Sequence, residues 1–236
     1  MVWITQLEAR RALGDSLFLH ISPRSVNKYV NAQWPLTWPL IAPFHRRVSL
    51  TGKRILQLFL RLEPFVVPTS MFPPTSKVEL VQTYQNIRDL VRLEGNFRAS
   101  NWYLSMHNDL ERDGFVSRKN QKFTSIKELD NFFTNEMLGM INSLRDIGYD
   151  DSLSADLGTA MISADGELVK SGSGDHRFAA SRELGVCCVP LRVISVDRKW
   201  LQTIGGGVRS AARISRLKEA LRGIEDTHRL CHCQRC

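Results

Sequence analysis

The segment from Ser173 to Arg177 is the part of the chain best suited to chemistry. It reads Ser-Gly-Asp-His-Arg and follows directly on Ser171-Gly172, so a flexible Ser/Gly loop leads into a helix expected over 175–184. The first N–H groups of a helix have no acceptor inside the helix, and the helix dipole is positive at that end. This arrangement favours an anion, above all a phosphate group.

Each residue type in the segment suits that ligand. Gly174 lets the backbone approach a phosphate closely, and Ser173 supplies a hydroxyl. Arg177 supplies a guanidinium that matches two phosphate oxygens. His176 can donate to phosphate or move a proton near neutral pH. The candidate phosphate-binding residues are therefore Ser173, Gly174, His176 and Arg177, and the candidate catalytic residues are His176 and Asp175.

Asp175 needs a separate explanation, because a carboxylate repels phosphate unless a cation lies between them. We therefore expect Mg²⁺ at this position, with Asp175 as a metal ligand. A simpler interpretation stays open, since a Gly/Ser turn followed by Asp is also how an ordinary strand-to-helix connection is made.

The neighbouring elements predict a small mixed α/β domain over 151–200. Short strands are expected over 157–163 and 167–170, joined by a tight turn at Asp165-Gly166. Gly185 should end the helix that begins near Asp175. The apolar run over 189–196 is typical of a buried strand.

This order of elements resembles the ParB/sulfiredoxin-like superfamily. The matching features are Asp165-Gly166 in the hairpin, the G-x-H-R segment Gly174-Asp175-His176-Arg177, Leu184-Gly185 at the helix end and Val189-Pro190 at the next strand. The preceding helical stretch also looks similar to uncharacterised proteins that carry such a domain, so the resemblance covers about residues 75–200.

In that superfamily the G-x-H-R segment holds nucleotide phosphates, so the resemblance implies a nucleoside triphosphate, ATP or CTP, with Mg²⁺. Sulfiredoxins need a Cys where this chain has Asp175, and partition proteins continue into a long helix-turn-helix region, whereas about 36 residues follow Trp200 here. The resemblance therefore implies a nucleotide-binding core and leaves its reaction unassigned. The first hypothesis is an enzyme that catalyses Mg²⁺-dependent phosphoryl transfer or nucleotide hydrolysis. The alternative is a non-catalytic module regulated by nucleotide or binding DNA.

Residues 76–150 are expected to form a three-helix region. Two of the helices begin with capping boxes, Ser76 with Glu79 and Ser125 with Glu128. The helix between them is expected over 100–112, with Gly114 as its stop. We expect this helical region to pack on the small mixed domain.

Both ends of the chain are basic. Residues 1–63 and 198–236 each carry a net charge of +6, against −4 for 64–197. Six of the nine prolines precede Pro73-Pro74, so residues 1–75 are predicted to form an irregular basic arm with short helices. Among these, 51–62 is an amphipathic helix expected to pack on its own domain, with a membrane surface or a partner as the alternatives.

Residues 201–236 are expected to form a basic helix and a Cys-rich tail. The helix should run over 208–224 with its arginines toward solvent, so nucleic acid is a further candidate partner. Gly205-Gly206-Gly207 lacks the Lys and Ser/Thr of a P-loop and is interpreted as a hinge. The tail CHCQRC, from Cys231, is either a Zn²⁺ ligand set or a frayed, redox-sensitive end.

Composition supports a folded protein: 43% of the 236 residues are hydrophobic and 24% are charged. No apolar run approaches the ~20 residues of a membrane-spanning helix, and charges near residue 10 interrupt any secretory signal. We expect a cytoplasmic protein without membrane contacts. The apolar surroundings of Cys187 and Cys188 predict two small core residues.

Overall fold

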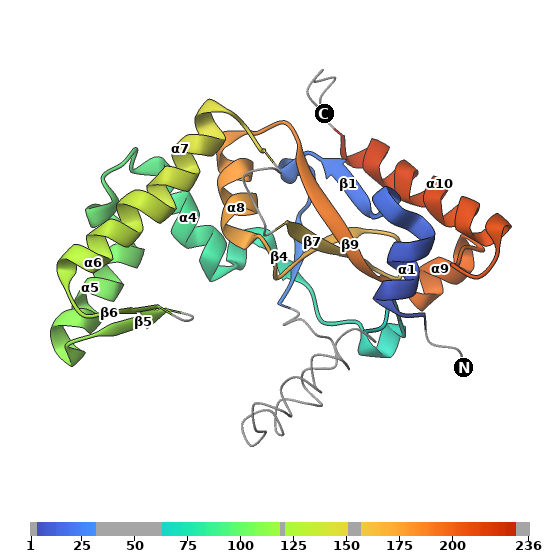
Figure 1. Ribbon diagram of the computed structural model, residues 1–236, viewed down its shortest axis with the longest axis horizontal. Coiled ribbons are helices and arrows are strands. Elements are labelled where there is room, and N and C mark those ends of the chain that lie inside the picture. The colour runs from blue at the N-terminus through green and yellow to red at the C-terminus, as the bar shows by residue number, and fades with distance from the viewer. Residues whose placement is uncertain (1–3, 32–62, 119–120, 151–156, 230–236) are drawn as a thin grey trace.

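The computed structural model describes residues 4–31, 63–118, 121–150 and 157–229. Its centre is a seven-stranded mixed sheet in the order β1-β9-β7-β8-β2-β4, with β3 pairing with the end of β9 (Figure 1). The strands are β1 (Phe18–Ile21), β2 (Lys28–Val30), β3 (Val66–Val67), β4 (Ser76–Lys77), β7 (Gly158–Ile162), β8 (Leu168–Ser171) and β9 (Val189–Asp197). With the surrounding helices, this confirms the expected α/β class.

The helices are α1 (Gln6–Leu13), α4 (Gln82–Arg92), α5 (Asn101–Asp113), α6 (Ile126–Asn131), α7 (Gly139–Asp146), α8 (Asp175–Leu184), α9 (Arg198–Thr203) and α10 (Ala211–His228). A π-helical segment, Phe132–Leu138, joins α6 to α7 into one continuous rod. Short 3₁₀ turns connect several of the other elements.

The sheet draws strands from both halves of the chain. β7 and β8 form the expected hairpin, whose turn uses Gly166 at φ +81°. β9 runs parallel to β7 and antiparallel to β1, and β2 runs parallel to β8. The arm expected over 1–75 therefore supplies β1, β2 and β3 to the sheet expected from 151–200 alone. Strands of two to four residues are too short to leave a hydrophobic period in the sequence.

Local capping signals predicted some helix ends correctly. Ser100 accepts a hydrogen bond from the Tyr103 N–H at the start of α5, and Gly114 ends that helix with φ +73°. Ser125 likewise accepts from the Glu128 N–H at the start of α6.

The prediction that Ser76 and Glu79 form a capping box at the start of a helix was wrong. Ser76 lies in β4, and α4 begins only at Gln82. Glu79 instead forms an ion pair with Arg182 of α8. The competing tertiary contacts, strand pairing with β2 and this ion pair, explain the difference.

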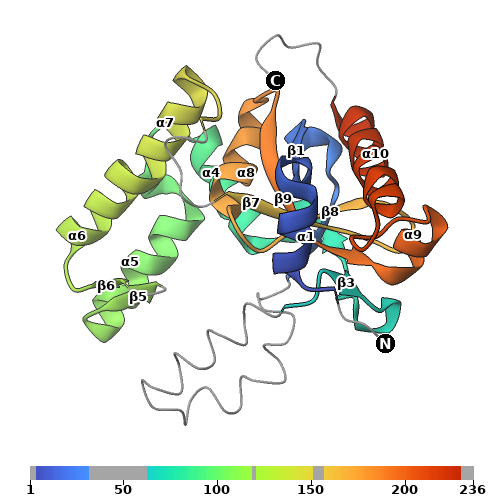
Figure 2. The same cartoon turned by 45° about the vertical axis from the view of Figure 1, so that its right-hand side comes forward.

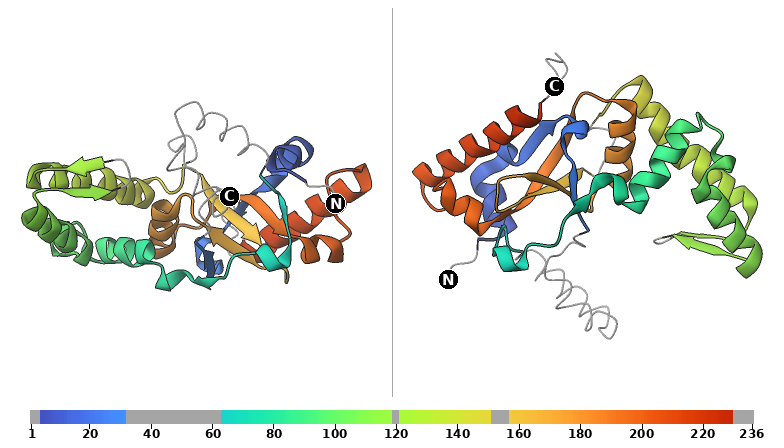
Figure 3. Two further views of the ribbon diagram at one scale, coloured as in Figure 1. Left: turned by 90° about the horizontal axis from the view of Figure 1, so that it is seen from below. Right: turned by 180° about the vertical axis from the view of Figure 1, so that it is seen from behind.

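A helical lobe extends away from the sheet, at the left of Figure 1. It contains α5, the α6–α7 rod and the hairpin of β5 (Val116–Arg118) and β6 (Gln121–Phe123). Trp102, Phe132 and Phe133 pack edge to face at its centre, with centroid distances of 5.1–6.0 Å. α4 and α7 pack on α8 and join the lobe to the sheet. Figure 3 shows the lobe and the sheet as two neighbouring bodies.

α9 and α10 lie on the side of the sheet away from the lobe (Figure 2). Leu217 and Leu221 are fully buried and hold α10 against the sheet region. The C-terminal end of α10 is tied to the turn after β1, because the His228 carbonyl accepts the Ser22 N–H at 2.9 Å. The predicted terminal helix is thus confirmed, three to four residues later than expected.

Four further expectations have different outcomes. Cys187 is exposed and Cys188 half-buried, so neither is the core residue that the sequence predicted; both follow the end of α8 in a loop. The 51–62 helix and the CHCQRC tail lie outside the described residues. Within the described residues, no helix is long and apolar enough to cross a membrane.

Candidate functional site

A row of three polar residues crosses the centre of the sheet. Arg192 of β9 pairs with Thr159 of β7, and Thr159 pairs with Ser171 of β8. Residues directly opposite each other on neighbouring strands point to the same face. Leu191 and Val193, on either side of Arg192, belong to the main hydrophobic core, so Arg192 points to the other face.

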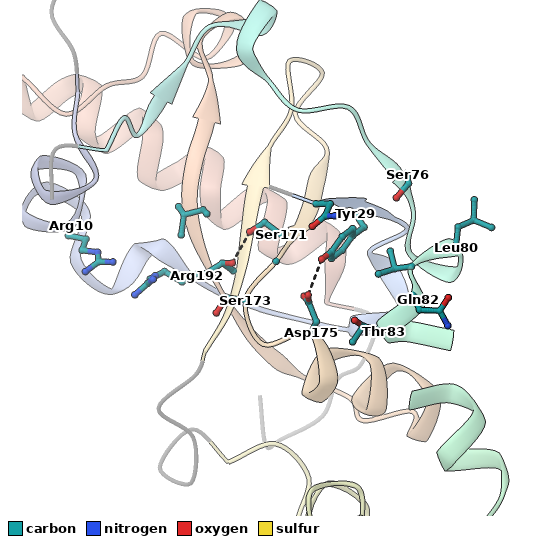
Figure 4. A pocket seen from close by; sticks show the side chains of 15 residues that line it. Arg10, Tyr29, Ser76, Leu80, Gln82, Thr83, Ser171, Ser173, Asp175 and Arg192 are labelled. Atoms are coloured by element: carbon teal, nitrogen blue, oxygen red, sulfur yellow. Dashed lines mark hydrogen bonds between the residues drawn. The ribbon is translucent and has the colours of Figure 1, made fainter. Parts of the chain in front are cut away.

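This row forms the floor of a cavity of about 950 Å³. The cavity extends around the end of β8, past the loop that precedes α8. Its lining residues include Arg10, Tyr29, Asn31, Ser76, Leu80, Gln82, Thr83, Ser173, Asp175 and Ile194. Figure 4 shows Arg10 and Arg192 at one end, Leu80, Gln82 and Thr83 at the other, and Ser171 and Ser173 between them.

The arginine end has an unmet hydrogen-bonding requirement. The Nε atom of Arg192 is buried, and no described residue accepts a hydrogen bond from it. Burial lowers the pKa of Arg192, and the positive charge of Arg10 lowers it further. A buried donor without an acceptor costs about 1–3 kcal/mol, and two cations facing one cavity repel each other. A bound anion would relieve both costs.

Asp175, at the middle of the cavity, is held by two donors. The Lys170 ammonium lies 2.6 Å from Asp175 Oδ1, and the Tyr29 hydroxyl donates to Oδ2 at 2.9 Å. The Lys170 side chain is only 1% exposed and also donates to the carbonyl oxygens of Ser171 and Ser173. Lys170 therefore connects the loop to the first turn of α8.

Tyr29 is positioned to stay protonated. Burial raises the pKa of its hydroxyl, and the charge of Asp175 raises it further. The hydroxyl consequently acts as a hydrogen-bond donor to Asp175 across the neutral pH range.

These contacts bear on the predicted Mg²⁺ site. A cation is expected beside Asp175, and the Lys170 ammonium occupies that place. Both oxygens of Asp175 are engaged, and the described residues contain no group of three or more His, Cys, Asp or Glu side chains that could hold a metal ion. Asp175 alone therefore does not form a metal site, and the Mg²⁺ prediction depends on phosphate oxygens from a ligand.

Of the predicted phosphate-binding residues, Ser173 lines the cavity, beside Asp175. Gly174 does not line it but performs the expected backbone role, since it precedes α8 with φ +68°. That conformation disfavours a residue with a side chain. The Ser173 hydroxyl donates to the Leu157 carbonyl oxygen at 3.2 Å.

His176 and Arg177 lie elsewhere. The His176 ring stacks on Trp102 of the helical lobe, with a centroid distance of 6.0 Å and an interplanar angle of 12°. Its Nε2 contacts the Arg118 guanidinium, which itself lies 4.4 Å from the centre of the Trp102 ring. Arg177 is half-buried and is not a lining residue. The structure brings Ser173 and Asp175 into the cavity and directs His176 to the contact between α8 and α5.

Sequence reasoning missed Arg10, Tyr29, Lys170 and Arg192. Two of these left a signal, because Lys170 and Arg192 are the single cations of their largely apolar strands, where a charge requires a specific partner. Arg10 left no signal in the sequence, because only the tertiary fold brings this residue of α1 to the cavity that Arg192 of β9 lines.

Comparison of the chain with protein-family models, with curated proteins and with solved structures finds no match. The resemblance to the ParB/sulfiredoxin-like superfamily stays a prediction, and the geometry of the cavity is the basis for a proposed function.

Proposed function

We propose that the protein binds a nucleotide, or a similarly phosphorylated small molecule, in the cavity beside the loop before α8. The observation that carries the proposal is the buried, unpartnered Nε of Arg192 next to the charge of Arg10. The phosphates would lie at these two guanidinium groups. Arginine is well suited to phosphate because its N–H groups match two oxygens at once.

The remainder of the cavity suits the rest of such a ligand. Tyr29, Leu80 and Ile194 supply apolar surface, while Asn31 and Gln82 supply amide groups that can donate and accept. A sugar and a base need this mixture of apolar faces and hydrogen bonds. The volume also falls within the range of roughly 300–1,000 Å³ typical of small-molecule sites.

The geometry supports binding more than turnover. Asp175 is held by Lys170 and Tyr29, and His176 packs against Trp102, so neither offers an uncommitted base at the cavity. Phosphoryl transfer or nucleotide hydrolysis would need a base supplied in another way. We therefore propose a nucleotide-binding module, and the experiment below measures turnover alongside binding.

The test is a titration of the whole chain with ATP, ADP, CTP, GTP and the matching nucleosides, with and without Mg²⁺. A ligand at about 100 times its dissociation constant should stabilise the fold by ~2.7 kcal/mol, which raises Tm by several degrees. Arg192→Gln should lower the affinity at least about tenfold. Arg177→Gln, the matched control from the predicted segment, should leave it unchanged.

The outcomes distinguish two candidate positions for the phosphates, the arginine end of the cavity and the start of α8. Loss of binding in Arg177→Gln with retention in Arg192→Gln would place the phosphates at the start of α8, as the sequence argument has it, and contradict this proposal. Absence of any nucleotide-dependent stabilisation in wild type would also contradict it. Steady release of phosphate or of a nucleoside diphosphate would add an enzymatic activity to the binding role.

A further inference from the structure

The polar row on the sheet contains a pair of buried hydroxyl groups. Thr159 Oγ1 lies 2.7 Å from Ser171 Oγ, and the two residues are only 4% and 1% exposed. Each hydroxyl carries one hydrogen, and the hydrogen bond within the pair uses one of the two. Among the described residues neither hydroxyl makes another hydrogen bond, so the second hydrogen has no protein acceptor. Both residues line the cavity, and an acceptor can therefore approach from there.

Arg192 is the neighbour of this pair in the row. Arg192 and Thr159 are directly opposite each other on β9 and β7, and neighbouring strands lie about 4.8 Å apart. The buried Nε of Arg192 also lacks an acceptor among the described residues. Two unused donors, one charged and one neutral, therefore lie on the same face of the sheet. A phosphate group presents several acceptor oxygens around one atom and can bind to both donors at once.

The charged residues of the lining limit how many phosphates the cavity suits. They are Arg10, Arg192 and Asp175, and all other lining residues, each within the described part of the chain, are uncharged. The two guanidinium groups are always protonated, and one phosphate ester carries a charge of about −1.5 to −2 at pH 7. One phosphate therefore balances the arginine end. A second or third phosphate would add negative charge for which the lining has no further cation.

Asp175 makes the middle of the cavity unsuitable for a chain of phosphates. Figure 4 shows Asp175 between the arginine end and the end formed by Leu80 and Gln82. A carboxylate repels phosphate oxygens but accepts hydrogen bonds from hydroxyl groups, at about four positions. Lys170 and Tyr29 occupy two of these positions. A ligand that extends from the arginines past Asp175 therefore fits better with sugar hydroxyls at this point than with phosphates.

We infer that the cavity takes a nucleoside monophosphate, with its phosphate at Arg192 and the Thr159–Ser171 pair and its sugar beside Asp175. This inference rests on the proposed nucleotide site and names the class of nucleotide. The hydroxyl pair donates to the phosphate that Arg192 binds, and the charge of Asp175 selects against longer phosphate chains. Because the arginines balance one phosphate, binding does not require Mg²⁺.

The first experiment compares phosphate chains of different length by calorimetric titration of the full chain. The probes are the common ribonucleosides and their 5′-mono-, di- and triphosphates, with and without Mg²⁺. For the base that binds, the monophosphate should bind at least about tenfold more tightly than the triphosphate, and Mg²⁺ should not change its affinity. Equal or tighter binding of the triphosphate would overturn the inference and leave the proposed nucleotide site intact. If no probe binds, the proposed site itself fails, and the inference fails with it.

The second experiment tests the hydroxyl pair. Thr159→Val/Ser171→Ala removes both partners of one hydrogen bond with little change of shape, so the unfolding curve should stay nearly unchanged. Monophosphate affinity should fall at least about tenfold, because a hydrogen bond to a charged group is lost. Thr203→Val/Ser105→Ala removes two exposed hydroxyls outside the cavity and should change the affinity less than about twofold.

The conservative variant Thr159→Ser keeps a hydroxyl in the pair and should retain the affinity of wild type. This variant distinguishes the loss of a donor from a general disturbance of the sheet. Equal monophosphate affinities in the two double variants would overturn the inference, whereas the proposed site would still stand on Arg192. A loss of affinity in Thr159→Ser as large as in the double variant at the pair would overturn it as well.

Discussion

The buried Lys170 ammonium forms an ion pair with Asp175 that joins β8, the second strand of the β-hairpin, to the first turn of α8, with 2.6 Å between Nζ and Oδ1. The same ammonium donates to two carbonyl oxygens of the intervening loop. One side chain thus determines the shape of the loop that lines the cavity. Lys170 is a positioning residue, because the cavity lining does not include it.

We predict that Lys170→Met lowers the free energy of unfolding by about 3 kcal/mol, because it removes the cation that pairs with Asp175 and the donor to two carbonyl groups. The matched control is Lys28→Met. Lys28 also forms a strand-borne ion pair, with Glu167, but both of those side chains are nearly half exposed, so its loss should cost less than about 1 kcal/mol. Urea denaturation measures both values, and equal costs would argue against a structural role for the buried pair.

Arg192→Met should have the opposite effect on the ligand-free protein. Removal of a buried donor without an acceptor is expected to raise the free energy of unfolding by about 1 kcal/mol, while nucleotide binding is lost. Arg182→Met is the contrasting control, since Arg182 donates to the carbonyl oxygens of Pro23 and Val26 and pairs with Glu79. That variant should be destabilised. A destabilised Arg192→Met would indicate that Arg192 has a structural partner instead of a ligand.

His176→Ala tests the site assigned from sequence against the site seen in the structure. Loss of the stack on Trp102 should lower the free energy of unfolding by about 1 kcal/mol and leave nucleotide affinity unchanged. Trp102→Leu should destabilise the protein in the same way, because it removes the other half of the contact. Calorimetric titration and urea denaturation of both variants give the two readouts. A large loss of nucleotide affinity in His176→Ala at unchanged stability would support the phosphate-binding assignment.

The stability of the protein should fall with acidification because of His228. Burial lowers the pKa of His228 below its ordinary value of 6.5, so the unfolded chain binds its proton more readily than the folded protein does. The stabilisation that comes from the neutral His228 of the folded protein is fully present above pH 6.5. It is lost as the pH falls from 6.5 toward the lower pKa that His228 has in the folded protein. Comparison of unfolding free energies across this range should show a smaller pH dependence for His228→Asn than for wild type. If His228→Asn shows the same pH dependence of unfolding free energy as wild type, other titratable groups cause that dependence.

Elements with strong local signals were predictable from the sequence. The Asp165-Gly166 turn defines the hairpin, Ser100 and Gly114 define α5, and Gly185 ends α8, because each of these depends on backbone geometry within a few residues. The prediction failed where tertiary contacts compete with a local signal. Ser76 could cap a helix, but in the fold it extends the sheet beside β2.

The candidate site was only partly predictable, for a geometric reason. Successive residues of a helix point about 100° apart, and the packing of α8 turns Asp175 toward the cavity and His176 toward Trp102. The sequence alone determined that the loop before α8 contains Ser173 and that Gly174 begins the helix. Only the tertiary structure decided that Asp175 meets Lys170 and Tyr29, and that β9 brings Arg192 into the cavity that Arg10 also faces. Such contacts depend on strand register and on helix packing between residues far apart in the chain, which no short segment specifies.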